Sequence, residues 1–220
     1  MRLSIAAAIV AAFLLSNSLA LGVQSAPQKG AKKPAPPPAA TIIQPKTYNI
    51  VPAESSLTIF VAKAGALSFL AHDHNIAVRS YSGRVVVPAA GPASGSVELD
   101  IDAKSLAVLD KVSEKDRKEI TNSMNTAVLE SGKFPKITFR SVGVSNVNGA
   151  SLTVNGDLTL HGTTKRIAVP VTVSATAQLL RATGKITIKQ TDFGITPYSA
   201  AAGSIKVKNE VVISFNVVAK

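Results

Sequence analysis

The chain has no cysteine and no tryptophan, and aromatic residues make up only 5% of its 220 residues. The absence of cysteine excludes disulfides, thiolate nucleophiles, thiolate zinc sites and iron–sulfur ligation, as well as a lipoprotein anchor, which needs a cysteine at its cleavage site. Any fold must therefore be held by packing alone. A hydrophobic content of 46% is enough for one substantial core, and predicts one domain with a tail more readily than two domains.

Acidic residues are also missing from the first part of the chain, where none precedes Glu54. Five of the 24 basic residues do precede it, so much of the net charge of +11 belongs to the N-terminal tail. The lysines that remain are scattered among polar strand positions, with no recognisable nucleic-acid motif. We therefore predict no nucleic-acid partner.

The first twenty residues have the pattern of an export signal. Arg2 precedes an apolar run from Leu3 to Leu15, and Ser18-Leu19-Ala20 suits a signal peptidase. An uncleaved transmembrane helix is the competing interpretation, but a span needs about 20 apolar residues and polar residues interrupt this run too early. We predict a signal peptide over 1–20, cleavage after Ala20, and a periplasmic or secreted protein.

Residues 21–46 are rich in proline and lysine and have little to bury, which predicts a disordered spacer before a domain over 47–220. Its lysines favour weak contact with an anionic membrane surface. The simpler interpretation is that they only keep a flexible tail solvated.

Alternating apolar and polar residues dominate the rest of the chain. In Val97–Asp102, for example, three apolar side chains face one way and three carboxylates the other. The same pattern predicts about eight antiparallel strands, with the others at Leu57–Lys63, Ile76–Val87, Lys136–Val144, Ser151–Leu160, Arg166–Ala177, Lys185–Lys189 and Ile205–Val218.

One segment breaks this alternation. Ser113 is a candidate N-cap, and Ile120, Met124 and Val128 follow at helical spacing, which predicts an inserted helix over Ser113–Glu130. A sheet of eight strands with one helix to cover it must close or pair face to face, because an exposed edge promotes aggregation. Closure predicts an all-β, antiparallel up-and-down β-barrel. Its mostly small inward side chains favour a cavity over a solid core.

Three segments, in this order, closely resemble signature segments of the YceI-like family: Val128–Ser141, Asn155–Lys165 and Thr191–Ile195. The resemblance covers about Tyr48 to Lys220. It implies a secreted or periplasmic, lipocalin-like barrel that binds an isoprenoid-type lipid, such as a quinone or a polyprenyl chain, and is not an enzyme. The chain departs from the family pattern near the first strands and at Lys189-Gln190, where relatives often carry an arginine.

The histidines are the candidate polar contacts. His72 and His74 are two residues apart and share a strand face, and His161 is the only other histidine. We expect these three at the mouth of the barrel, where they contact loop carbonyls or a lipid head group. The alternative is a metal-binding or stress-related barrel in which their three nitrogens hold zinc or copper.

The predicted lipid pocket is an inward apolar stripe, whose parity a shift of one residue would reverse. Its residues are Phe60, Leu99, Ile101, Ile137, Phe139, Leu158, Leu160, Val169, Val171, Ile186 and Ile188. Between them, Gly156 and Gly162 predict tight turns or bends.

Sequence motifs for catalysis are lacking, since the chain has no Gly-x-Ser-x-Gly elbow, no His-Glu-x-x-His and no glycine-rich phosphate loop. We therefore predict no enzyme activity, no catalytic residues and no cofactor. A structural or interaction barrel whose interior is filled by side chains, with no ligand, remains the other alternative.

Overall fold

The computed structural model describes residues 45–70 and 72–220. The chain divides into two units, residues 1–40 and 41–220, and every described residue lies in the second. The predicted signal peptide (1–20) and the spacer as far as residue 44 lie outside the described residues. Within the described ranges, no helix is both long and apolar enough to cross a membrane.

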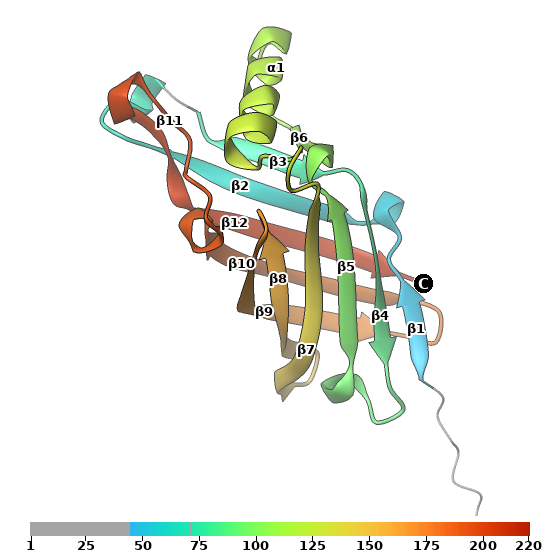
Figure 1. The fold of residues 1–220 in the computed structure, drawn as a ribbon. Helices are drawn as coiled ribbons and strands as arrows, with labels where there is room; N and C mark the ends of the chain where they lie inside the picture. The colour runs from blue at the N-terminus through green and yellow to red at the C-terminus, as the bar shows by residue number, and fades with distance from the viewer. Residues whose placement is uncertain (1–44, 71) are drawn as a thin grey trace, which may run out of the picture. The chain divides into compact units, whose positions relative to one another are not determined.

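The described domain is built from antiparallel strands in one strongly curled sheet (Figure 1). The strands are β1 (Lys46–Asn49), β2 (Ser56–Ala64), β3 (His74–Val78), β4 (Tyr81–Val87), β5 (Ser96–Asp102), β6 (Leu106–Val108), β7 (Lys136–Asn148), β8 (Ser151–Leu160), β9 (Thr163–Ala175), β10 (Leu180–Lys189), β11 (Ser199–Ala200) and β12 (Ile205–Ala219). Their order in the sheet is β1-β4-β5-β7-β8-β9-β10-β12-β2-β3-β6, with β11 paired to β12.

The two ends of this strand order meet where the chain bends between β3 and β4 and between β5 and β6. β3 continues into β4 through Arg79 and Ser80, while β5 continues into β6 through a 3-10 turn, Ala103–Ser105. The Arg79 amide donates to the Ser105 carbonyl at 3.2 Å, and the Asp102 amide donates to the Ser80 carbonyl at 3.0 Å. The pairs β3–β4 and β5–β6 therefore act as two bent strands, which confirms the predicted up-and-down barrel of about eight strands.

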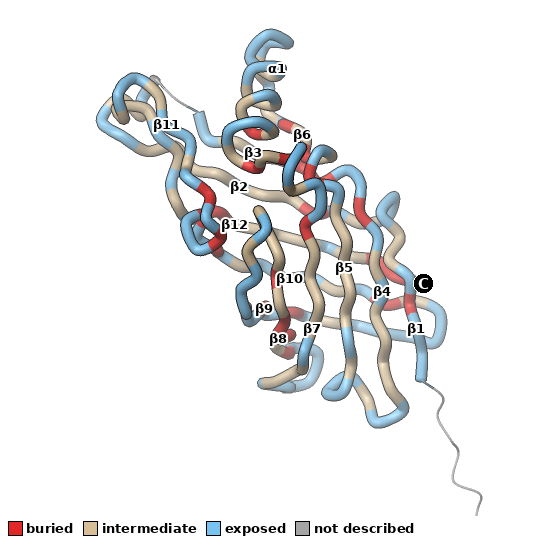
Figure 2. Tube along the Cα trace, in the orientation of Figure 1, coloured by how far each residue is buried: buried red, intermediate tan, exposed pale blue. Residues whose placement is uncertain are grey.

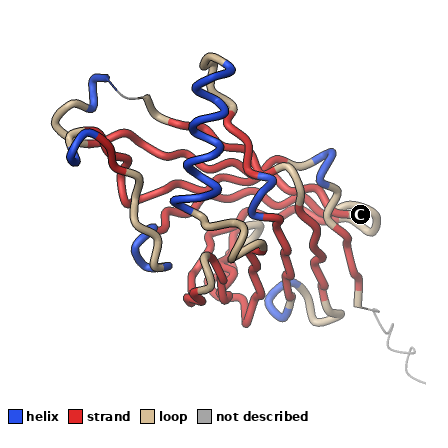
Figure 3. The backbone as a smooth tube through the Cα atoms, turned by 45° about the horizontal axis from the view of Figure 1, so that its top comes forward, coloured by secondary structure: helices blue, strands red, loops and turns tan. Residues whose placement is uncertain are grey.

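The helix α1 (Glu114–Ser123) is inserted between β6 and β7, as the apolar spacing predicts. The Ser113 hydroxyl accepts from the Asp116 amide at 3.1 Å, so Ser113 is the N-cap. α1 runs into a π-helical turn, Met124–Val128, and lies across the end of the barrel beside β3 and β6 (Figures 1 and 3).

Burial follows the alternation of the strands. Along β8, for example, buried and intermediate residues alternate from Leu152 to Leu158. Figure 2 shows that much of the length of the long strands is of intermediate burial. At the end remote from α1, Tyr48 of β1 is buried with Leu180 and Ala219, and its hydroxyl donates to the Thr176 carbonyl at 2.7 Å. β1, which the sequence did not predict, therefore packs against the base of the barrel.

Candidate binding site

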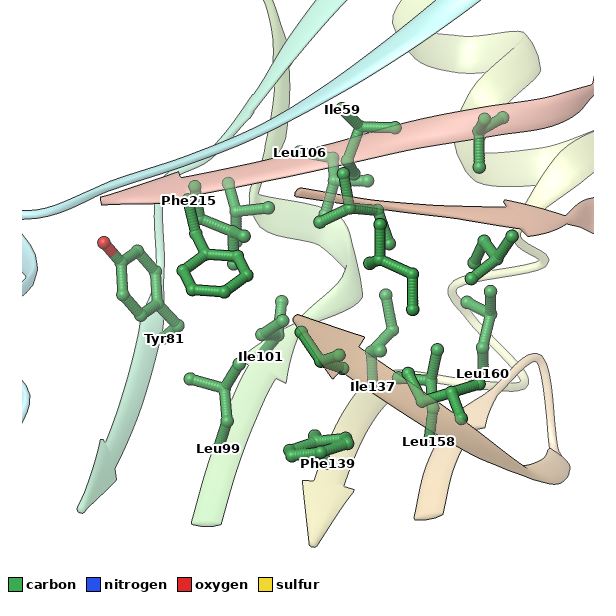
Figure 4. Close-up of a pocket in the computed structure, with 18 of the residues that line it drawn as sticks. Ile59, Tyr81, Leu99, Ile101, Leu106, Ile137, Phe139, Leu158, Leu160 and Phe215 are labelled. Atoms are coloured by element: carbon green, nitrogen blue, oxygen red, sulfur yellow. The ribbon is translucent and has the colours of Figure 1, made fainter. Parts of the chain in front are cut away.

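The barrel interior encloses an apolar cavity of about 270 Å³ (Figure 4). Its wall is made by the inward side chains of the long strands, together with Met124, Val128 and Leu129 from the helical insertion. Among the described residues that line it, only Tyr81 and Gln190 have polar side-chain nitrogen or oxygen atoms. The interior therefore offers a ligand hydrocarbon contact on almost every side.

Ten of the eleven predicted pocket residues line this cavity. They are Leu99, Ile101, Ile137, Phe139, Leu158, Leu160, Val169, Val171, Ile186 and Ile188. The parity chosen for five strands thus matches the direction in which their side chains point.

The prediction for Phe60 was wrong. Leu57, Ile59 and Val61 are the β2 residues that line the cavity, and Phe60 between them is 38% exposed. The pairing of β2 with β12 sets this parity, because Ile59 lies opposite Ile213, which also faces the cavity. In a strand with apolar residues on both faces, the largest side chain does not identify the inner face.

Several lining residues were missed by sequence reasoning. Ile76 and Val78 come from β3, Leu106 from β6, and Val211, Ile213 and Phe215 from β12. The sequence did carry a signal for β12, because its two polar residues between Val211 and Val218, Ser214 and Asn216, share the parity opposite to the lining residues.

Two glycines make room for the aromatic rings of the wall. A Cβ at Gly156 would lie 2.3 Å from Cζ of Phe139, and one at Gly184 would lie 2.4 Å from Cζ of Phe215. Gly156 therefore permits close approach inside β8 and does not form the predicted turn or bend. Gly162, with φ of 72°, does lie in the β8–β9 turn as predicted.

A second cavity of about 520 Å³ lies between the barrel and α1, and we call it the vestibule. It shares Val61, Ile76, Met124, Val128 and Gln190 with the apolar cavity, so the two spaces adjoin. Its polar lining comprises His74, Asp116, Glu119, Asn122, Ser123, Gln190 and Tyr198. No lysine or arginine occurs among the described residues that line it, so His74 is the one basic side chain in the lining beside two carboxylates.

Gln190 marks the junction of the two cavities. It starts a 3-10 turn, Gln190–Phe193, is 7% exposed, and donates from Nε2 to the Lys208 carbonyl at 2.8 Å. Its amide oxygen accepts no hydrogen bond from the described part of the chain. That oxygen is therefore an acceptor available to a ligand at the entrance of the barrel.

His74 is the one predicted mouth histidine that lines the vestibule. Its Nδ1 lies 2.8 Å from Oδ2 of Asp110, and Oδ1 of Asp110 accepts from the Asn75 amide at 2.9 Å. Burial alone would raise the pKa of Asp110, but hydrogen bonds from Asn75 and His74 outweigh it and hold the pKa below its usual value. A neutral imidazole that donates from Nδ1 to this carboxylate presents Nε2 as an acceptor.

The other two histidines lie elsewhere. Nε2 of His161 is 2.7 Å from Oε2 of Glu130, and its ring packs on Phe134 at a centroid distance of 4.4 Å. This contact joins the β8–β9 turn to the end of the helical insertion, and His161 lines neither cavity. His72 is exposed and also lines neither cavity.

The alternative of a three-histidine metal site is not assembled in the structure. Across residues 45–70 and 72–220, no group of three or more histidine, aspartate or glutamate side chains is placed to hold a metal ion. His74 and His161 are instead each paired with a separate carboxylate.

The fold and cavities define the class of protein: an antiparallel up-and-down barrel with an apolar interior and a polar vestibule. The sequence profile of the YceI-like domain matches residues 48–219, so the chain belongs to this family, as the motifs predicted. It is 31% identical over 121 residues to a UPF0312 protein of Shewanella oneidensis and 32% identical to one of Shewanella putrefaciens. Those alignments cover 52% of this chain and 60% of each relative.

Two solved structures share the fold. BcnA of Burkholderia cenocepacia superimposes with a TM-score of 0.63 at 24% identity, over 78% of this chain and 99% of that one. A polyisoprenoid binding domain from Saccharophagus degradans gives a TM-score of 0.57 at 16% identity, over 79% and 97% of the two chains. At these identities the likeness establishes the fold alone.

Proposed function

We propose that this protein binds a lipid with an isoprenoid-type chain, such as a quinone or a polyprenyl lipid, with the chain inside the barrel. The observation that carries the proposal is the apolar cavity adjoining a polar vestibule. Each 100 Å² of hydrocarbon removed from water contributes about 2.5 kcal/mol, so a chain needs no polar contact to bind. The polyisoprenoid binding domain with the same fold supports this ligand class.

The vestibule favours a head group that donates hydrogen bonds. The amide oxygen of Gln190 and the carboxylates of Asp116 and Glu119 are acceptors in its lining. A hydroxyl head, as in a polyprenol or a reduced quinone, complements these atoms. A diphosphate head places negative charge beside these two exposed carboxylates, which is unfavourable even in a solvated pocket.

Substitution of a wall residue tests the proposal. Ile188 is 7% exposed and lines the cavity, whereas the exposed Thr187 beside it points outward. Protein purified from its host is extracted with organic solvent, and the extract is analysed by mass spectrometry. We expect lipid in the wild type and in T187R but none in I188R.

Two results contradict the proposal. One is a folded I188R protein that retains its lipid. The other is a wild-type protein that yields no lipid and takes up neither an added prenyl quinone nor a prenyl alcohol, and this result favours a barrel without a ligand.

We also propose that the chain is exported, with cleavage after Ala20, and that it acts as a binder and not as an enzyme. The sequence of the first twenty residues supports export. Cell fractionation and the intact mass of the mature protein test it. Recovery of an added lipid with unchanged mass after prolonged incubation tests the absence of catalysis.

A further inference from the structure

Two loops project together beyond the barrel at the end where α1 lies (Figures 1 and 3). One follows β2 and contains the 3-10 turn Ser68–Leu70, and the other carries β11 and the turn Ala201–Gly203. The Leu67 amide donates to the Ser204 carbonyl at 2.9 Å, which ties one loop to the other. We call residues 62–70 and 196–209 the apical arm.

The apical arm has an apolar tip and a basic flank. Phe69 is 71% exposed, more than any other large hydrophobic residue of the described chain, and Tyr198 is 41% exposed. In sequence the arm contains three lysines, Lys63, Lys206 and Lys208, and no aspartate or glutamate. Lys206 and Lys208 are exposed on the face of β12 opposite the cavity-lining residues.

The arm is also one wall of the entrance. Tyr198 and Val207 line the vestibule, and the Val207 amide donates to the Tyr198 carbonyl at 3.1 Å. A lipid that passes between a bilayer and the vestibule therefore passes beside this wall.

We propose that the apical arm docks on an anionic phospholipid surface, with Phe69 in the interface and Lys206 and Lys208 over the head groups. This inference rests on the proposed function, because a protein that binds a membrane lipid must meet the bilayer that supplies it. An exposed aromatic side chain gains from burial at the acyl boundary. Lysines close to an anionic leaflet add attraction that falls with salt.

Because the chain has no tryptophan, a single introduced tryptophan reports on the arm without interference from the basic spacer. We expect the emission of F69W to shift to the blue with vesicles of phosphatidylcholine and phosphatidylglycerol, and to stay unshifted with phosphatidylcholine alone. F60W is the matched control, since Phe60 is exposed on the outer wall of β2. The proposal is overturned if the emission maximum of F69W does not shift with anionic vesicles, or shifts only as much as that of F60W.

Vesicle cosedimentation of the full chain measures the contribution of each part. We expect F69S to weaken binding about tenfold. K206E/K208E should weaken it by more than about fivefold for each lysine, because each substitution removes a positive charge and adds a negative one. F60S and R181E/K185E, which change exposed residues of the barrel wall in the same way, should bind as the wild type does.

The two proposals fail separately. If every variant cosediments equally, or if the F69W shift follows protein concentration and not anionic lipid, docking through the arm is overturned while extraction still reports the bound lipid. If the wild type yields no lipid but F69W still inserts, docking is supported and the proposed function is contradicted.

Discussion

Nδ1 of His74 lies 2.8 Å from Oδ2 of Asp110, and this pair joins the start of β3 to the segment that leads into α1. Asp110 also accepts from the Asn75 amide, and its own carbonyl accepts from Arg117 of α1 at 2.8 Å. Asp110 therefore connects His74, in the wall of the vestibule, to helix α1, which faces that wall.

The depressed pKa of Asp110 predicts a pH-dependent contribution to stability. A carboxylate whose pKa is lower in the folded state stabilises the fold above the unfolded pKa of about 3.9 and loses that contribution as pH falls through the folded pKa. We expect D110N to lower the free energy of unfolding by about 1–2 kcal/mol at neutral pH.

Urea unfolding of wild type and D110N across a pH series measures this contribution. The gap between the two proteins should begin to narrow as the pH falls below about 4 and should close as it falls through the lower folded pKa, where Asp110 is protonated and both side chains are neutral. A gap that stays constant from neutral to acidic pH contradicts the assignment.

Tyr81 provides the opposite case, a polar group that its surroundings do not satisfy. It is 8% exposed, and within the described structure its buried hydroxyl has no hydrogen-bond partner. Burial raises the pKa of the phenol, and the nearby Ser55 hydroxyl only partly offsets this effect. The Ser55 hydroxyl is itself engaged, since it donates to the Val51 carbonyl and accepts from the Val218 amide.

We therefore expect Y81F to leave the protein as stable as the wild type or to stabilise it by about 1 kcal/mol, because no hydrogen bond is lost. The phenol is neutral below its unfolded pKa of about 10, so the difference between the proteins should be constant up to there. Above it, the wild type should lose stability relative to Y81F until the folded pKa is passed, because the phenol ionises in the unfolded state while the buried phenol stays protonated. Thermal melts of the wild type and Y81F measure this difference in stability. If Y81F were less stable by several kcal/mol, the Tyr81 hydroxyl would make a hydrogen bond, which contradicts the structure.

The alternation of single strands predicted most of the barrel, and the failures have physical causes. β8 is found at its predicted bounds, Ser151–Leu160, because its two faces differ in polarity along their whole length. Phe60 was misassigned because β2 is apolar on both faces, and only its pairing with β12 sets the parity.

Gln190 was missed for a different reason. It stands in a polar run, Lys189 to Asp192, that resembles a surface turn, and it is buried only because the 3-10 turn brings its amide to the Lys208 carbonyl. Contacts between residues 18 positions apart cannot be inferred from local pattern. The apolar stripe was therefore predictable in most strands, whereas His74 was the one polar residue of the entrance that the sequence predicted.

Gly156 tests how closely the wall is packed around Phe139. In G156A the new Cβ lies 2.3 Å from Cζ of Phe139 and 2.8 Å from the Arg140 carbonyl, so the ring must move into the cavity. We expect a loss of about 1–3 kcal/mol in the free energy of unfolding and a lower lipid content. A Cβ at Gly143 would have nothing within 4 Å, so G143A is the control and should retain both properties. Equal behaviour of the two variants contradicts close packing at Gly156.

The charge of the vestibule predicts which head group the protein selects. Glu119 lines the vestibule, and Glu114, on the same helix, does not. In E119K, a side chain that repels a bound diphosphate is replaced by one that attracts it. In a solvated pocket this change favours diphosphate binding by about 1 kcal/mol or more, which is about fivefold in affinity. E114K makes the same change of charge away from the vestibule and should shift selectivity less.

Competition between a prenyl alcohol and the prenyl diphosphate of the same chain length measures that selectivity. We expect the wild type to prefer the alcohol, and E119K to move the ratio of the two dissociation constants toward the diphosphate by about fivefold. Because the hydrocarbon chain is shared, its burial cancels in the ratio and only the head group is compared. A wild type that prefers the diphosphate, or an E119K ratio no different from that of E114K, places head-group recognition outside the vestibule.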